Sequence, residues 1–157
     1  MGVAAGIRPM RWWDIEQVAA IEAEVFDESR WSVEQFWSEL AQPTRTYVVM
    51  DDASLRERSI IGYAGVFVLG SESDVQTIAI APSGQGRGLG RALMEHLLEQ
   101  ARQQGATQMI LEVRADNEPA VRLYRALGFV QISTRRGYYG PGIDAWIMRL
   151  RPLPRPS

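Results

Sequence analysis

Apolar residues at helical spacing predict two helices near the start of the chain. In residues 13–25, one helical face is formed by Ile15, Val18, Ile21, Glu22 and Val25. A second helix follows, because Ser32 and Gln35 form a capping box while Trp31 and Phe36 occupy the two positions of a hydrophobic staple. The tryptophans of this part are expected in helix packing rather than in a binding cage: Trp12, Trp13, Trp31 and Trp37.

The pattern then becomes extended. Residues 46–50 and 60–68 are rich in β-branched and aromatic side chains, and they predict a hairpin-like pair of strands across a polar stretch. A third strand at 75–80 leads through a glycine-rich turn into a helix that ends near Gln104. A strand at 108–114 follows, so this part of the sequence predicts a β-α-β unit.

The last third of the chain predicts one helix and two strands. Asn117 can cap the helix, with Pro119 in its first turn, and Gly128 can end it. Residues 129–134 and 144–150 are expected to be strands around a loop at 135–142. The order of the elements predicts an α/β (α+β) protein with a mixed sheet covered by helices.

Length and composition narrow the class of protein. The 157 residues predict a single domain over 1–157, with flexible tails at 1–6 and 151–157. There is no long apolar run and no signal-peptide pattern, so a cytoplasmic protein without a membrane partner is expected. The net charge of -2 argues against direct binding of nucleic acid.

The scarcity of two residue types excludes several kinds of chemistry. The sequence has no cysteine, which excludes disulfides, thiolate metal sites and a catalytic thiol. His96 is the single histidine and lies within a predicted helix, so neither a histidine metal cluster nor a Ser-His-Asp triad is expected. We therefore expect no metal site.

The clearest chemical signal is a glycine-rich stretch between a predicted strand and a predicted helix. It comprises Gln85, Gly86, Arg87, Gly88, Leu89, Gly90 and Arg91. Glycines let the backbone approach a ligand closely, and amide groups at a helix N-terminus attract anions. The glycine spacing does not fit a Rossmann fingerprint, and a P-loop would need a lysine, which the sequence lacks. A phosphate site is predicted, with a ligand-free turn as the alternative.

The Gln-x-x-Gly-x-Gly pattern at 85–90 resembles the acetyl-CoA loop of the GNAT superfamily, the GCN5-related N-acetyltransferases. The resemblance continues through residues 77–82, 111–117, 123–129 and 135–139, which look like the RimI branch of ribosomal-protein alanine N-acetyltransferases. It covers most of residues 7–150 and is weaker in the N-terminal third.

The resemblance implies a GNAT fold with a mostly antiparallel sheet of about seven strands and helices on both faces. It implies acetyl-CoA as cosubstrate, with the pantetheine arm on the backbone of Ile78, Ala79 and Ile80, the pyrophosphate at 86–91, and a contact from Asn117. By the same resemblance Glu112 would be the general base and Tyr124 the general acid. The acceptor would be a protein N-terminal amine, that of the alanine starting the eighteenth small-subunit ribosomal protein, attacking directly in a ternary complex.

The residues themselves leave alternatives for these roles. Glu112 shares a strand face with Ile110 and Arg114, and a surface pair with Arg114 is the plain structural explanation for it. The strand is expected to be covered on both faces, which favours a functional reason for a carboxylate there. Tyr124 shares its helix face with apolar residues, so core packing is the alternative to the general acid.

The acceptor is expected near two segments. One is the loop after the first helix, with Glu24, Asp27 and Glu28, and the other is the loop carrying Tyr138 and Tyr139. A solvated acidic turn is the alternative for the first segment. The competing functions are acetylation of a small amine or a protein lysine, and a catalytically silent acyl-CoA sensor. A monomer or weak dimer is expected.

Overall fold

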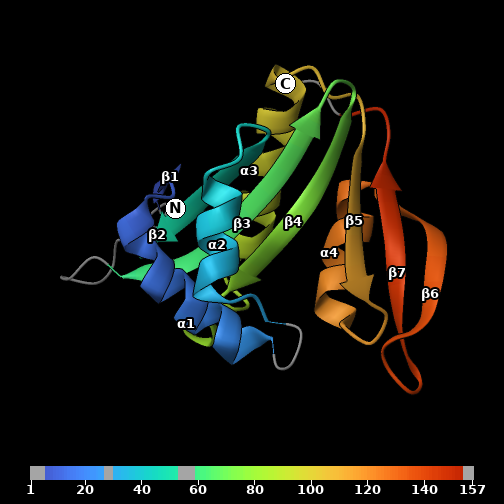
Figure 1. Ribbon diagram of the computed structural model, residues 1–157. Helices are drawn as coiled ribbons and strands as arrows, with labels where there is room; N and C mark the ends of the chain where they lie inside the picture. The colour runs from blue at the N-terminus through green and yellow to red at the C-terminus, as the bar shows by residue number, and fades with distance from the viewer. Residues whose placement is uncertain (1–5, 27–29, 53–58, 154–157) are drawn as a thin grey trace. The chain divides into compact units, whose positions relative to one another are not determined.

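The protein is built on one seven-stranded sheet of order β1-β2-β3-β4-β5-β7-β6. The computed structural model describes residues 6–26, 30–52 and 59–153. Its elements (Figure 1) are β1 Gly6–Pro9, the 3-10 turn η1 Trp12–Asp14, α1 Ile15–Val25, α2 Val33–Leu40, β2 Arg45–Asp51, β3 Ile60–Leu69, β4 Glu72–Ile80, the 3-10 turn η2 Pro82–Gly84, α3 Leu89–Gln103, β5 Met109–Arg114, α4 Glu118–Leu127, β6 Val130–Gly140 and β7 Ile143–Leu150. The expected mixed, mostly antiparallel sheet with helices is confirmed.

Contacts along the chain divide it into two compact units. Unit 1 comprises Met1–Phe67 and Gln76–Leu97, and unit 2 comprises Val68–Val75 and Leu98–Ser157. The chain passes from one unit to the other within β3, β4 and α3. That residues 1–157 act as a single domain stays a prediction.

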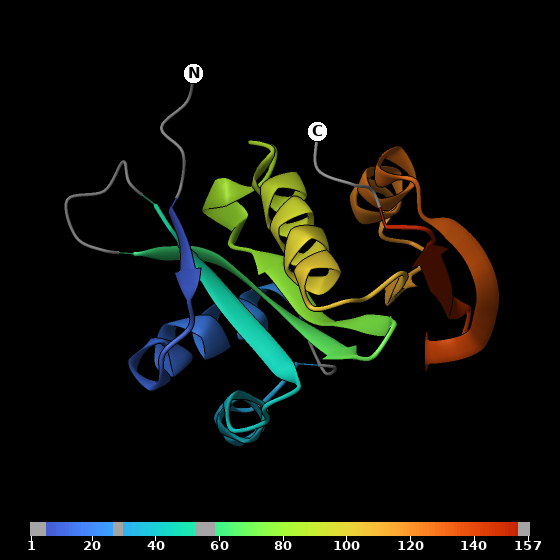
Figure 2. The same cartoon turned by 90° about the horizontal axis from the view of Figure 1, so that it is seen from above.

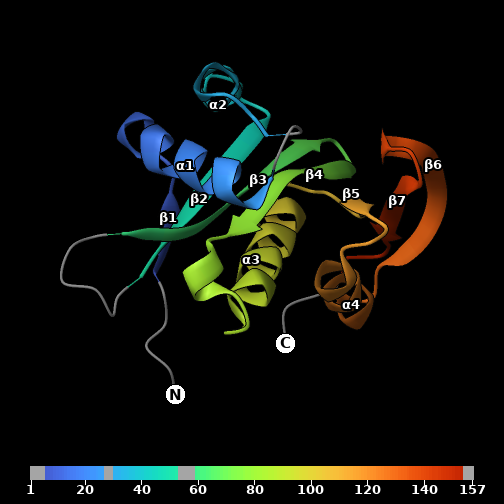
Figure 3. The same ribbon diagram turned by 90° about the horizontal axis from the view of Figure 1, so that it is seen from below.

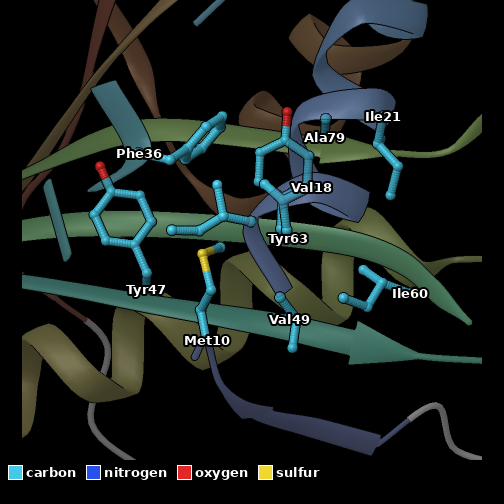
Figure 4. Packing of buried hydrophobic residues seen from close by; sticks show 10 residues of the cluster. Met10, Val18, Ile21, Phe36, Tyr47, Val49, Ile60, Tyr63 and Ala79 are labelled. Carbon is cyan, nitrogen blue, oxygen red and sulfur yellow. The ribbon is translucent and has the colours of Figure 1, made fainter. Parts of the chain in front are cut away.

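Helices cover both faces of the strands in unit 1. Figures 2 and 3 show α1 and α2 on one side of β1, β2 and β3, and α3 on the other. On the first side, Val18 and Ile21 of α1 join Phe36 and Tyr63 in a buried cluster (Figure 4), where the rings of Phe36 and Tyr63 meet edge to face at 5.8 Å. On the other side, a Cβ at Gly62 would lie 3.3 Å from Leu93 of α3.

The start of α2 has the predicted capping box and hydrophobic staple. The Ser32 hydroxyl accepts from the Gln35 amide at 3.2 Å, and the Gln35 side chain accepts from the Ser32 amide at 2.7 Å. The ring of Trp31 lies 5.3 Å from that of Phe36, as the hydrophobic staple requires. The capping box and the staple are therefore confirmed.

Unit 2 is organised around β5. Asp74 of β4 pairs in parallel with Ile110 of β5, which confirms the predicted β-α-β unit, and β7 lies antiparallel between β5 and β6. Helix α4 starts at Asn117, whose side chain accepts from the Ala120 amide at 3.3 Å, and ends at Gly128 with a φ of 104°. The predicted cap and stop of this helix are confirmed.

The predicted tails are too long. Gly6 already belongs to β1, opposite Asp51 of β2. At the other end, Leu153 is buried and its amide donates to the Thr107 carbonyl at 3.0 Å. A four-residue strand that contains a proline is too short to show a period of two, so the sequence pattern gave no sign of β1.

The loop expected at 135–142 is wrong, because β6 continues to Gly140. Arg135 pairs with Ala145 and Gly140 with Ile143, and the register shifts between these two pairs. The irregularity accommodates the extra residues, including Gly137 with its positive φ of 62°. A bulged strand with glycines resembles a loop in sequence, which explains the error. Tyr138 and Tyr139 consequently lie on a strand.

The prediction of helix packing holds for Trp31 and is wrong for the other three tryptophans. Trp12, Trp13 and Trp37 are 61%, 59% and 48% exposed. Trp12 meets Trp13 edge to face and stacks on Trp37, with ring centres 5.6 and 6.2 Å apart. The buried stripe of the first helix begins at Ile15, after these tryptophans.

Among the described helices, none is long and apolar enough to cross a membrane.

Candidate active site

The glycine-rich stretch forms the connection between β4 and α3 in unit 1. Gly86 and Gly88 have φ of 78° and 80°, and a Cβ at either would meet no atom within 4 Å. Backbone conformation rather than space therefore requires glycine at both positions. Gly84 differs, because its Cβ would lie 2.6 Å from the Ile61 side chain.

The backbone of this connection leads into the open first turn of α3. The amides of 89–91 have no acceptor within the helix, because the first bond into it is donated by Ala92 to the Gly88 carbonyl at 3.2 Å. These amides form the N-terminus of α3 at Leu89. The Gln85 side chain donates to the Ile80 carbonyl at 3.2 Å and so ties the turn to the end of β4. Free amides at a helix N-terminus can hold an anion.

Two arginines flank these amides, and both are paired with carboxylates. Arg87 lies 3.7 Å from Asp52, and Arg91 lies 2.9 Å from Glu95 one helical turn along. The guanidinium side chains are about half exposed. Exposed ion pairs contribute little stability, so either arginine can turn to a bound phosphate at small cost.

Glu112 lies in a cluster of polar side chains in unit 2. Along β5, Leu111 and Val113 are buried while Glu112 is on the opposite face with 29% of its side chain exposed. Its carboxylate accepts from the Tyr139 hydroxyl at 3.3 Å and lies 3.6 Å from the Arg135 guanidinium. The expectation that this face of the strand is covered is therefore wrong at Glu112.

The neighbours of Glu112 form a network of charges and rings. Arg114 donates twice to Asp116 at 3.0 Å, and its guanidinium lies over the Tyr139 ring at 5.5 Å. Arg135 lies over the Tyr138 ring at 5.3 Å. Burial and the nearby Glu112 raise the pKa of Tyr139 to about 12, so this phenol keeps its proton and donates to the carboxylate.

Tyr124 is buried on α4, where its ring lies 5.9 Å from that of Phe129. This contact is what core packing requires. Its hydroxyl, however, has no hydrogen-bond partner among the described residues, and burial raises its pKa to about 12. The phenol is therefore protonated at neutral pH and able to donate.

The residues expected to contact the acceptor and the cosubstrate lie on several elements. Glu24 is exposed on the last turn of α1, whereas Asp27 and Glu28 lie outside the described residues. Asn117 uses its side-chain oxygen to cap α4. Ile78 and Ile80 are partly exposed on β4, while Ala79 between them is buried. The 85–91 stretch belongs to unit 1 and Glu112 to unit 2.

The sequence profile of the Acetyltransferase (GNAT) family matches residues 10–129. The chain belongs to the GNAT family. The N-alpha-acetyltransferase RimI of Mycobacterium tuberculosis is 39% identical over 142 residues, which cover 87% of this GNAT chain and 85% of that protein. An uncharacterized protein of Mycobacterium leprae is 40% identical over 142 residues, 87% of this chain, and this chain spans 38% of its length.

Solved structures with the GNAT fold are also similar to this chain. The ribosomal-protein-S18-alanine N-acetyltransferase of Escherichia coli has a TM-score of 0.82 and 30% identity, covering 97% of this chain and 96% of that one. NAA60 of Arabidopsis thaliana, solved in complex with acetyl-CoA, has a TM-score of 0.84 and covers 93% of this chain and 97% of that one. At 20% identity the second likeness shows the fold alone.

Sequence reasoning gave no chemical role to Glu22, although it placed this residue on the apolar face of the first helix. The side chain is buried, and it accepts hydrogen bonds from Tyr63 and Thr77. A glutamate at an apolar position of a helical stripe was the available signal.

Within the described residues of this GNAT chain, no group of three or more His, Asp or Glu side chains could hold a metal ion.

Proposed function

We propose that this GNAT enzyme transfers the acetyl group of acetyl-CoA to the N-terminal amine of a protein, namely the alanine that starts ribosomal protein bS18. The observation that carries the proposal is the glycine turn at 86–88, which leads into the first turn of α3, where the amides of 89–91 have no acceptor within the helix. The relatives named for N-alpha-acetylation and for S18-alanine acetylation support the choice of acceptor.

The turn suits the pyrophosphate of a coenzyme A thioester. In the proposal, the amides of 86–91 bind this group, with Arg87 and Arg91 adding charge-assisted bonds. The strand residues Ile78, Ala79 and Ile80 hold the pantetheine arm through their backbone. Asn117 contacts the cosubstrate with its side-chain nitrogen, because its oxygen caps α4.

Acetyl-CoA supplies the activated acetyl group when it is bound. In the proposed reaction Glu112 accepts a proton from the acceptor amine, and Tyr124 donates its hydroxyl proton to the thiolate that leaves. An N-terminal amine has a pKa of about 7.7–8.0, so one modest base is enough near neutral pH. The sequence has no cysteine to carry the acetyl group, which favours direct attack in a ternary complex.

The acceptor peptide is proposed to meet the acidic residues Glu24, Asp27 and Glu28 and the tyrosines Tyr138 and Tyr139. Acidic and aromatic side chains suit a peptide whose second residue is basic. We place the enzyme in the cytoplasm, as a single domain that is a monomer or a weak dimer.

The test is release of coenzyme A with three acceptors. They are a peptide beginning Ala-Arg, the same peptide with a blocked N-terminus and an internal lysine, and a small polyamine. Turnover confined to the free N-terminus is expected. Turnover only on the blocked peptide or the polyamine would contradict the proposed acceptor. No turnover despite tight acetyl-CoA binding would indicate a sensor.

A further inference from the structure

Glu22 is a buried carboxylate that the proposed reaction does not use. It lies on the third turn of α1 and is 1% exposed. The Tyr63 hydroxyl of β3 donates to it at 2.7 Å, and the Thr77 hydroxyl of β4 donates at 3.2 Å. All three residues belong to unit 1.

A second buried carboxylate in unit 1 shows what is unusual about Glu22. Asp14 is 2% exposed and forms an ion pair with Arg8 at 2.8 Å. Glu22 has no such cation among the described residues, and the two donors to it are hydroxyl groups. Burying a carboxylate without a cation opposes folding, and an apolar side chain would pack more favourably at this position. Packing by itself therefore does not explain a glutamate here.

One partner of Glu22 belongs to a segment that the proposed function uses. Thr77 immediately precedes Ile78, the first of the three β4 residues proposed to hold the pantetheine arm. Tyr63, the other partner, belongs to β3. The carboxylate thus joins α1 both to β3 and to the strand of the cosubstrate.

We propose that Glu22 is a positioning residue for acetyl transfer, which holds β4 at Thr77 against α1 and β3. The inference rests on the proposed function. Reaction rates depend steeply on geometry, so a displacement of β4 of about 1 Å lowers the rate by about a hundredfold. Glu22 acts through these neighbours and does not touch the reacting atoms.

The chain offers a matched control for this role. Glu39 of α2 accepts from the Tyr47 hydroxyl of β2 at 2.7 Å, the same length as the bond from Tyr63 to Glu22. Both tyrosines belong to one buried cluster, and Figure 4 shows their hydroxyls directed to the same side of the sheet. Among the described residues, the side chains of Glu39 and Tyr47 form no hydrogen bond to a segment assigned to the cosubstrate.

The experiment compares Glu22→Gln and Thr77→Val with Glu39→Gln. For each variant we would measure the Kd of acetyl-CoA by calorimetry, kcat and KM with the Ala-Arg peptide, and the Tm. We expect Glu22→Gln and Thr77→Val to raise the Kd of acetyl-CoA by about tenfold, because β4 is no longer held in place. Glu39→Gln should change the Tm while both constants stay at the wild-type values.

Tyr63→Phe and Tyr47→Phe provide a second pair should Glu22→Gln fail to fold. Each removes one hydroxyl from the same cluster, and only Tyr63→Phe should change the binding constants. Equal constants across both pairs, with losses of Tm alone, would overturn the inference while leaving the proposed function intact. Wild-type protein that binds no acetyl-CoA would overturn both.

Discussion

Burial controls the protonation of the two phenols in unit 2. Tyr124 and Tyr139 both have their pKa raised to about 12, chiefly because each is removed from water, with Glu112 adding to the effect at Tyr139. An exposed tyrosine has a pKa of about 10. Both side chains therefore stay protonated through the range in which an N-terminal amine becomes neutral. A donor with this property suits protonation of a leaving thiolate.

Replacing Tyr124 by Phe should lower kcat by about a hundredfold, because general acid catalysis contributes on the order of 10²–10⁴. The KM values should change little, since the ring contact with Phe129 is kept. Because the pKa of Tyr124 is about 12, ionisation of this residue should not lower the wild-type kcat near pH 10. Steady-state rates between pH 6 and 10.5 check both points, with Tyr47→Phe as the control for loss of a buried hydroxyl. Equal rates for the wild type and Tyr124→Phe would leave core packing as the role of this residue.

Replacing Glu112 by Gln should slow acetyl transfer by about a hundredfold, because the base is removed while the shape of the side chain is kept. The Kd of acetyl-CoA should not change. Calorimetry and coenzyme A release measure the two quantities, and Glu118→Gln, at a side chain that is 82% exposed, is the control. Unchanged turnover at neutral pH would rule out Glu112 as the base.

At the scale of elements, the connection between β4 and α3 combines two separate demands. Gly84 is buried against Ile61 and is needed for packing. Gly86 and Gly88 face open space and are needed for their positive φ. The same turn leads directly into the N-terminus of α3, where the amides of 89–91 have no acceptor within the helix. The shape of the turn therefore also presents these amides to an anion.

Alanine at Gly86 or Gly88 should cost stability and also weaken acetyl-CoA binding. Gly70, in the turn before β4, has a φ of 61° and an equally open Cβ position. Each of the three changes should cost about 1–2 kcal/mol, the penalty of a left-handed conformation for alanine. Only the changes at Gly86 and Gly88 should raise the Kd of acetyl-CoA. Urea unfolding and calorimetry distinguish the two effects, and equal Kd values for all three variants would argue against a binding turn.

At the scale of the whole molecule, two buried carboxylates of unit 1 should give opposite pH dependence of stability. Burial raises the pKa of Glu22, and the bonds from Tyr63 and Thr77 offset this only in part. Burial also disfavours ionised Asp14, but the bonds from Arg8 and Arg11 outweigh it and lower the pKa of that carboxyl. The sign of each contribution follows from linkage.

The stability that protonated Glu22 contributes is present below its unfolded pKa, about 4.3, and is lost as the pH rises through its higher folded value. The wild type should therefore lose stability relative to Glu22→Gln as the pH rises.

Ionised Asp14 contributes stability above its unfolded pKa of about 3.9. This stability is lost as the pH falls through the lower pKa of the folded state. The advantage of the wild type over Asp14→Asn should shrink in acid. Denaturant midpoints of the three proteins between pH 3 and 8 test both signs, and parallel curves would contradict them.

Local signals in the sequence determined most of the elements and the family. The capping box at Ser32, the cap at Asn117 and the stop at Gly128 depend on neighbours within a few residues, so the sequence alone located them. The glycine spacing of 85–91 likewise follows from local backbone demands. The roles of Glu112, Tyr124 and the acceptor residues stay predictions.

Contacts between distant segments decided the rest. The extension of β6 depends on its register with β7, and β1 exists because β2 pairs with it. The partners of Glu112 come from β6, and those of Glu22 from two strands at least 41 residues away. The burial of Tyr124 raises its pKa only when α4 is packed. Pairing, burial and desolvation depend on what the folded chain brings together, which no local pattern specifies.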